Sequence, residues 1–136
     1  MADLRSTVYG KLSGDVTLHA LGLAADAVYL NNSADSPTAD RFMVLRWGSD
    51  VPLMGAQRSP KERSLELWVY DRGYSYEYVC AILSRGDAAL KELVGASTGS
   101  GYIVDIRWAG DSDDGWDDVY ERVFKSATYT IVGTGD

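Results

Sequence analysis

Five aspartates fall within the short polar segment 109–118, where their carboxylates could bind a cation. They are Asp111, Asp113, Asp114, Asp117 and Asp118. An EF-hand loop needs oxygen ligands at its first, third and fifth positions and glycine at its sixth. Counting from Asp111 places Gly115 fifth and Trp116 sixth, so that register fails. Three interpretations remain: a solvated hairpin tip, a weak cation site, or an electrostatic role.

Other catalytic combinations lack a necessary member. His19 is the only histidine, so neither a His–Cys metal cluster nor a convincing Ser-His-Asp triad can be assembled. No serine lies in a Gly-x-Ser-x-Gly elbow. Asp117 and Asp118 are adjacent, which on a strand directs them to opposite faces and prevents shared acid–base work. We therefore expect no enzyme activity, no metal and no cofactor.

Two further features have a structural interpretation. Cys80 is the only cysteine, which excludes an internal disulfide, and its place beside an apolar helical stripe predicts a buried side chain. The glycine-rich segment 95–101 leads into a strand, whereas a phosphate-binding loop opens a helix.

The segment 63–94 is expected to organise the chain. Residues 64–70 alternate, with Leu65, Leu67 and Val69 on one face, and so predict a strand with a core side. Residues 75–94 carry apolar side chains at three- and four-residue spacing and predict a helix. Gly86 lies in that apolar stripe, where it either allows close approach to a sheet or interrupts the helix.

The remaining elements follow from the same patterns. The sequence predicts helices at 3–12 and 15–22, a short strand at 27–30, a central strand at 41–47, and strands at 102–108 and 119–132. The last two form an antiparallel hairpin with Asp114-Gly115 at its turn. In the first of them the alternation places Tyr102, Val104, Ile106 and Trp108 on one face and Ile103, Asp105 and Arg107 on the other; in the second, Val119, Val123, Ala127, Tyr129 and Ile131 share one side. The fold class is therefore α+β, with a mostly antiparallel sheet of four to five strands and two main helices packed on one face.

Length and charge limit the alternatives. The chain has 136 residues, which predicts one domain over 1–136. Its net charge of −7 disfavours binding through DNA phosphates, and an equal alternative is that the charge only keeps the protein soluble. No apolar run is long enough to span a membrane, and the start lacks the build of a secretory signal. We expect the protein to stay in the cytosol of the cell that makes it.

A long connection at 48–62 is a candidate interaction surface. Long loops in compact domains often bind partners, and apolar residues at a loop tip are explained if another subunit covers them. Packing onto the same domain is an equal alternative. Trp68 and Tyr70 lie opposite the core face of their strand and could anchor an interface. The candidate interface residues are Val51, Leu53, Met54, Arg58, Trp68 and Tyr70.

The order of these elements resembles the tail terminator (tail completion) proteins of phages with long, non-contractile tails, particularly phages that infect actinobacteria. The resemblance covers most of the chain. It rests on residues 27–29, 41–46, 65–71, 73–76, 81–85, 108–114, 117–118 and 127–131.

This resemblance implies a structural protein that forms a sixfold ring, ends polymerisation of the tail tube, and joins the tube to the neck. The implied partners are further copies of the chain, the tail tube protein and the neck or head-completion protein, with DNA passing unbound and no membrane. The location would be the tail–neck junction of a virion assembled in the host cytoplasm. Asp111, Asp113 and Asp114 would face the lumen or a partner. A neck connector, a minor tail protein, and a small soluble ligand-binding or enzymatic domain are the alternatives.

Overall fold

The computed structural model describes residues 4–30, 40–52, 61–73, 76–98 and 101–134, with the backbone alone at 49–52. Their elements, in order, are α1 (Leu4–Ser13), α2 (Val16–Ala20), the 3-10 helix η1 (Ala25–Ala27), β1 (Val28–Leu30), β2 (Arg41–Pro52), β3 (Lys61–Asp71), α3 (Glu77–Lys91), β4 (Ile103–Asp111), β5 (Gly115–Asp117) and β6 (Arg122–Gly133).

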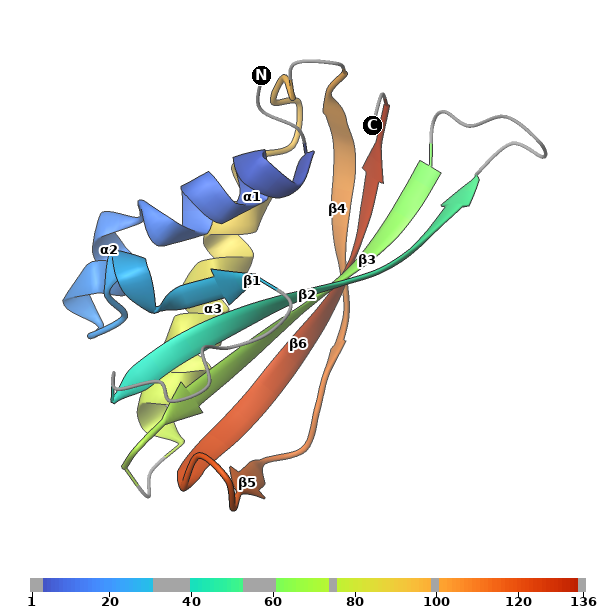
Figure 1. Ribbon diagram of the computed structural model, residues 1–136. Coiled ribbons are helices and arrows are strands. Elements are labelled where there is room, and N and C mark those ends of the chain that lie inside the picture. The colour runs from blue at the N-terminus through green and yellow to red at the C-terminus, as the bar shows by residue number, and fades with distance from the viewer. Residues whose placement is uncertain (1–3, 31–39, 53–60, 74–75, 99–100, 135–136) are drawn as a thin grey trace.

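The strands form one twisted sheet with the order β1-β2-β3-β6-β4, and the short β5 also pairs with β6. Only the β1–β2 pair is parallel. The helices lie together on one side of the sheet (Figure 1). The predicted α+β class is confirmed, with β5 as an additional short strand. The strand predicted at 41–47 is interior, paired with β1 and β3, and its residues 42–45 are buried on both faces as predicted. The middle strand of the order is β3, however, and not β2.

The main core lies between this helical layer and the sheet. Leu65, Leu67 and Val69 are fully buried on β3, as their alternation predicts. On α3 the buried positions are Val79, Ile82, Leu83, Gly86, Ala89 and Leu90. The helix is continuous through Gly86, where an added Cβ would lie 3.3 Å from Leu67 Cδ1. Gly86 therefore permits close approach of helix and sheet.

The β2–β3 hairpin is longer than predicted. Both strands continue past 41–47 and 64–70, and Pro52 pairs with Lys61. Seven of the fifteen residues of the connection expected at 48–62 are therefore strand, namely 48–52 and 61–62, with a change of register between Trp47 and Asp50. The extension escapes prediction because Gly48 and Pro52 are residues that usually weaken strands.

The edge strand β4 departs from simple alternation. Its pairing with β6 shifts register between Ile103 and Asp105 and again between Trp108 and Gly110. Each irregularity turns the following side chains to the other face. Ile103 and Ile106 are therefore both buried, although the sequence pattern placed them on opposite faces.

The turn before β6 also differs from its prediction. Asp114-Gly115 is not the turn, because Gly115 begins β5 and pairs with Phe124. The chain reverses at residues 118–121 instead. Val119, predicted on the inner face of the last strand, lies in this turn and is 87% exposed. Val123, Ala127, Tyr129 and Ile131 are buried as predicted.

Candidate functional site

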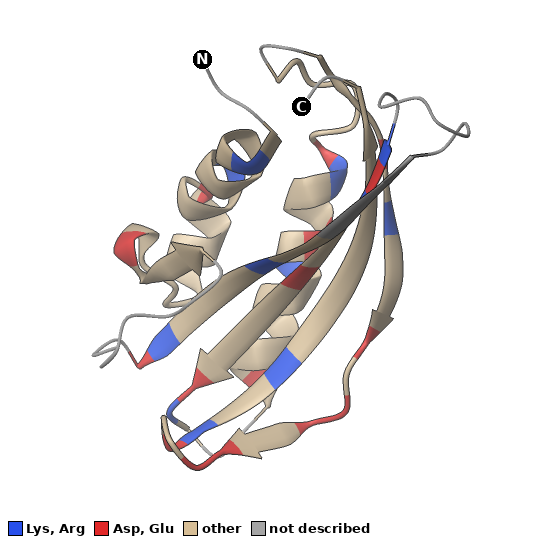
Figure 2. Ribbon diagram, turned by 45° about the vertical axis from the view of Figure 1, so that its right-hand side comes forward, with Lys and Arg blue, Asp and Glu red and all other residues tan. Residues whose placement is uncertain are grey.

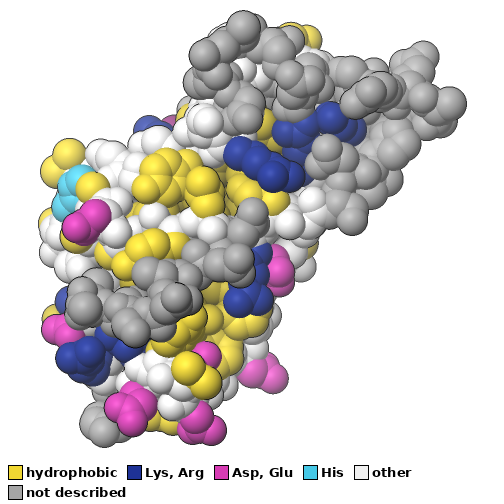
Figure 3. Space-filling model, in the orientation of Figure 1, with side chains coloured by type: hydrophobic (Ala, Val, Ile, Leu, Met, Phe, Trp, Pro, Cys, Tyr) yellow, Lys and Arg dark blue, Asp and Glu magenta, His cyan; other side chains and the backbone are white. Residues whose placement is uncertain are grey.

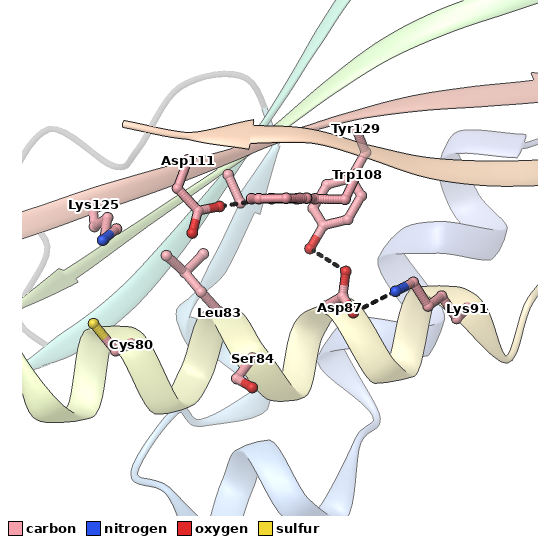
Figure 4. Close-up of a pocket in the computed structure, with 10 residues that line it drawn as sticks. Cys80, Leu83, Ser84, Asp87, Lys91, Trp108, Asp111, Lys125 and Tyr129 are labelled. Atoms are coloured by element: carbon pink, nitrogen blue, oxygen red, sulfur yellow. Dashed lines mark hydrogen bonds and ion pairs between the residues drawn. The ribbon is translucent and has the colours of Figure 1, made fainter. Parts of the chain in front are cut away.

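A groove, here called the α3–β4 groove, runs between α3 and the strands β6 and β4 (Figure 4). It exists because α3 packs mainly on β3 and β6 and leaves much of β4 uncovered. The groove has a volume of about 290 Å³. Leu83, Asp87 and Lys91 line it from the helix, and Trp108 and Lys125 line it from the strands. Trp108 is 56% exposed, so the groove offers an aromatic surface to a partner.

The polar groups of the groove are mostly bound to one another. Tyr129 donates its hydroxyl hydrogen to Asp87 Oδ1 at 3.1 Å, and Lys91 Nζ lies 2.9 Å from Asp87 Oδ2. Burial, reinforced by the neighbouring Asp87 carboxylate, raises the pKa of Tyr129. The phenol therefore stays protonated and donates a hydrogen bond at neutral pH. Trp108 donates Nε1–H to Asp111 Oδ1 at 2.8 Å.

Cys80 lies at this groove and is exposed. The prediction of a buried cysteine is therefore wrong. Cys80 sits at the edge of the apolar stripe of α3, on the side of the helix that lines the groove. Periodicity identifies the stripe but does not reveal that the sheet extends beyond the helix.

The end of the molecule that contains the chain from the end of β4 through β5 to the start of β6 is rich in acidic residues. Figure 2 shows acidic positions concentrated along this path, and in Figure 3 acidic side chains gather at the lower end of the molecule. Asp113 and Asp114 are exposed, and Asp114 lies 3.5 Å from Lys125 Nζ. Asp111 is also exposed but turns toward Trp108 in the groove. The three aspartates predicted to act together thus have different surroundings.

The β5–β6 turn at residues 118–121, here called the hairpin tip, is held by local hydrogen bonds. Asp117 Oδ1 accepts the backbone N–H groups of Val119 at 2.9 Å and Tyr120 at 2.8 Å. Tyr76 donates its hydroxyl hydrogen to the Gly115 carbonyl oxygen at 2.9 Å, which attaches β5 to the start of α3. Val119 therefore projects from an anchored turn.

The helix-free face of the sheet carries an aromatic cluster at the same end. Tyr70 stacks on Phe42 with ring centroids 4.6 Å apart, and Trp68 stacks on Phe124 at 5.5 Å. Arg46 lies over the Trp68 ring at 4.7 Å. Tyr70 is only 3% exposed, so its own chain already covers it. Trp68 is half-buried and keeps more surface for a partner.

The other candidate interface residues are mostly beyond what the structure describes. Leu53, Met54 and Arg58 lie outside the described residues. The backbone of Val51 belongs to β2 and pairs with Glu62. His19 is exposed on α2, with Nε2 2.7 Å from the Ser13 carbonyl oxygen.

The described residues include no group of three or more His, Cys, Asp or Glu side chains placed to hold a metal ion. The sequence did not single out the hairpin tip or the α3–β4 groove as sites. Asp117 could have indicated the turn, since Asp side chains often bond to backbone N–H groups two or three residues onward. The groove has no local sequence signal because it depends on where the helix lies across the sheet.

Comparison with known proteins finds a similarity of fold. No protein-family model matches the chain, and no curated protein matches it. A solved structure described as the virion of a native gene transfer agent particle contains a chain with a similar fold, at a TM-score of 0.72. The alignment covers 98% of this chain and 96% of that chain, with 18% sequence identity. At that identity the likeness shows a shared fold. No helix in the described ranges is both long and apolar enough to cross a membrane.

Proposed function

We propose that this protein is a structural component of a phage or phage-like virion, and specifically a tail terminator that forms a sixfold ring on the tail tube. The observation that carries the proposal is the fold likeness to a chain of a gene transfer agent virion, at a TM-score of 0.72 and over nearly the full length of both chains. The resemblance of the element order to tail terminator proteins supports the finer assignment.

The surface of the chain is consistent with assembly. Large apolar side chains are exposed at several separate places, and such surface is usually covered by partners when it is extensive. They include Val16, Tyr102, Val104, Trp108, Trp116 and Val119. In the proposed ring, Trp68 contacts a neighbouring subunit or the tube, as do the apolar and basic residues Val51, Leu53, Met54 and Arg58. Tyr70 packs against Phe124, the ring on which Trp68 stacks.

The acidic end suits a ring through which DNA passes. With a net charge of −7 per chain, each copy repels the phosphate backbone, and exposed Asp113 and Asp114 would strengthen that repulsion where they face the lumen. DNA could then slide past without binding. The neck or head-completion protein would contact the ring on the side away from the tube.

Electron microscopy and gene removal test this function together. Purified protein should form rings with sixfold symmetry. Particle-producing cells that lack the gene should make tubes of uncontrolled length without attached heads. A neck connector would instead leave tube length unchanged, and a minor tail protein would leave heads joined to tails. Either result would reject the terminator assignment.

The remaining alternative, a small ligand-binding or enzymatic domain, would use the groove of about 290 Å³. It predicts a monomer that binds a small molecule with measurable affinity. A metabolite-library screen by thermal shift, run in parallel with the ring assay, would identify such a function.

A further inference from the structure

We propose that the hairpin tip of one copy docks in the α3–β4 groove of a second copy, with Val119 as the inserted side chain. The proposal rests on the self-assembly proposed above and adds which surfaces meet. Each chain carries an exposed apolar side chain at its hairpin tip and a groove on another part of its surface.

The apolar residue at the hairpin tip is Val119. Its side chain is 87% exposed, so it does not occupy the groove of its own chain. The turn that carries it is fixed by the two hydrogen bonds to Asp117 and by the link between Tyr76 and Gly115. An anchored turn loses less conformational entropy on docking than a flexible loop does. Exposing a branched apolar side chain at such a position is explained if a partner covers it.

The groove can receive that side chain. Its volume of about 290 Å³ exceeds what one valine needs, and Leu83 and the exposed Trp108 ring supply apolar contacts. Burying a valine side chain contributes on the order of 1.5 kcal/mol or more to association.

Charge complementarity favours the same pairing. Asp118 and Glu121 lie in the same turn as Val119 and are exposed. Two lysines border the groove, and the side chain of Lys91 is 56% exposed. An ammonium group has three hydrogens to donate, so Lys91 can bind Asp87 and also donate a hydrogen bond to a carboxylate of a second copy. The groove carboxylates Asp87 and Asp111 already bind Tyr129 and Trp108.

The symmetry of this contact agrees with a ring. The tip and the groove are different surfaces, so the contact is head-to-tail, and repeating it closes a ring when the rotation per copy allows. Each copy would then use its tip once and its groove once. A separate protein as occupant of the groove would not produce this repetition.

The single native cysteine gives a direct test because Cys80 lies at the groove. Val119→Cys protein is oxidised with diamide, which takes up the two thiol hydrogens as the disulfide forms, and is analysed on a non-reducing gel. We expect a ladder of linked species beyond the dimer. The ladder should disappear when Cys80→Ser is added, because the bond joins the tip to Cys80 of the next copy.

Val16→Cys is the matched control, since Val16 is 77% exposed on α2, away from the hairpin tip. A ladder no stronger than in this control overturns the contact. Products that end at the dimer, persist with Cys80→Ser, or consist only of an internally bonded monomer overturn it as well. In the cysteine-free background, Val119→Ser should weaken self-association roughly tenfold in sedimentation experiments while leaving the melting temperature of the monomer at low concentration unchanged.

The two proposals fail separately. Sixfold rings of the unmodified protein without a Cys80-dependent ladder would reject this contact and leave the terminator function standing. A Cys80-dependent ladder in particles whose tube length is independent of the gene would retain the contact and reject the function.

Discussion

At the residue scale, Asp15 and Arg85 join two helices that are distant in sequence. Arg85 donates two hydrogen bonds to the Asp15 carboxylate, at 2.7 and 2.9 Å, and so links the start of α2 to the middle of α3. These hydrogen bonds, together with the positive charge of the guanidinium, lower the pKa of Asp15 against the opposing effect of burial. Planar, two-point pairing of this kind is specific to arginine.

Asp15→Asn should therefore destabilise the protein in a pH-dependent way. The folded pKa of Asp15 lies below its ordinary value, so its stabilising contribution is present above about pH 4 and is lost as the pH falls through the folded pKa. Urea unfolding between pH 3 and pH 7 would measure the difference from the unmodified protein. The difference should be largest near neutral pH and shrink at low pH. A difference independent of pH would contradict this role.

Glu121 offers a second prediction at this scale. Its φ of 54° is a left-handed backbone conformation, which is unfavourable in free energy for most residues that carry a Cβ. Glu121→Gly should raise the free energy of unfolding by about 0.5–1 kcal/mol, as the strain removed exceeds the added chain entropy. Thermal denaturation would measure it. Asp118→Gly, in the same turn but without positive φ, is the control and should not stabilise.

At the element scale, the contact of α3 with β3 depends on the absence of a side chain at Gly86. Alanine at this position would bring its Cβ to 3.3 Å from Leu67 Cδ1, which a flexible side-chain methyl can accommodate with a small shift. Alanine also favours helix over glycine by about 1 kcal/mol. The two effects oppose each other.

Gly86→Ala should therefore change stability by less than about 1 kcal/mol, whereas Gly86→Val should cost about 1–3 kcal/mol by overpacking. Chemical denaturation of both variants would test this. Ala88→Val, at an exposed position of the same helix, is the control and should cost only the small helix penalty of a β-branched residue.

The elements also show what sequence could predict. The period-two pattern of β3 and the apolar stripe of α3 were sufficient to identify those elements and their buried faces, because both lie in the regular centre of the sheet. The α3–β4 groove and the hairpin tip could not be predicted. The groove depends on the position of one element across others, and the tip depends on Asp117 prevailing over the usual turn dipeptide Asp114-Gly115. Of the two breaks in the pairing of β4, the second coincides with Gly110, whose φ is 137°, whereas the first, between Ile103 and Asp105, has no glycine to indicate it.

At the scale of the whole molecule, β3 and β6 form the centre of the described structure. β2, β4, β5 and α3 each contact one or both of them, and α1, α2 and β1 join the structure through α3 and β2. β3 and β6 pair along eleven residues of each, and they carry both the helical layer and the aromatic cluster. Elements so interconnected should unfold together, as one domain. Tryptophans lie near different parts of the sheet and so provide a probe distinct from backbone circular dichroism.

A single cooperative transition is therefore expected. Unfolding curves from tryptophan fluorescence and from far-ultraviolet circular dichroism should coincide within error for the monomer at low concentration. Separate midpoints would indicate that the helical layer and the sheet are independent units. Repeating the measurement at higher protein concentration should raise both midpoints equally if copies associate in the folded state.

The irregular edge of β4 has a consequence for the many copies that a virion requires. A straight, exposed strand invites the edge of another sheet to add to it, and such addition can continue without limit into aggregates. Because of its two breaks in register, the outward-facing N–H and C=O groups of β4 do not match the hydrogen-bond spacing of a regular incoming strand. Copies crowded together during particle production would thus be hindered from joining backbone to backbone, which leaves side-chain contacts of defined geometry as the means of finding one another.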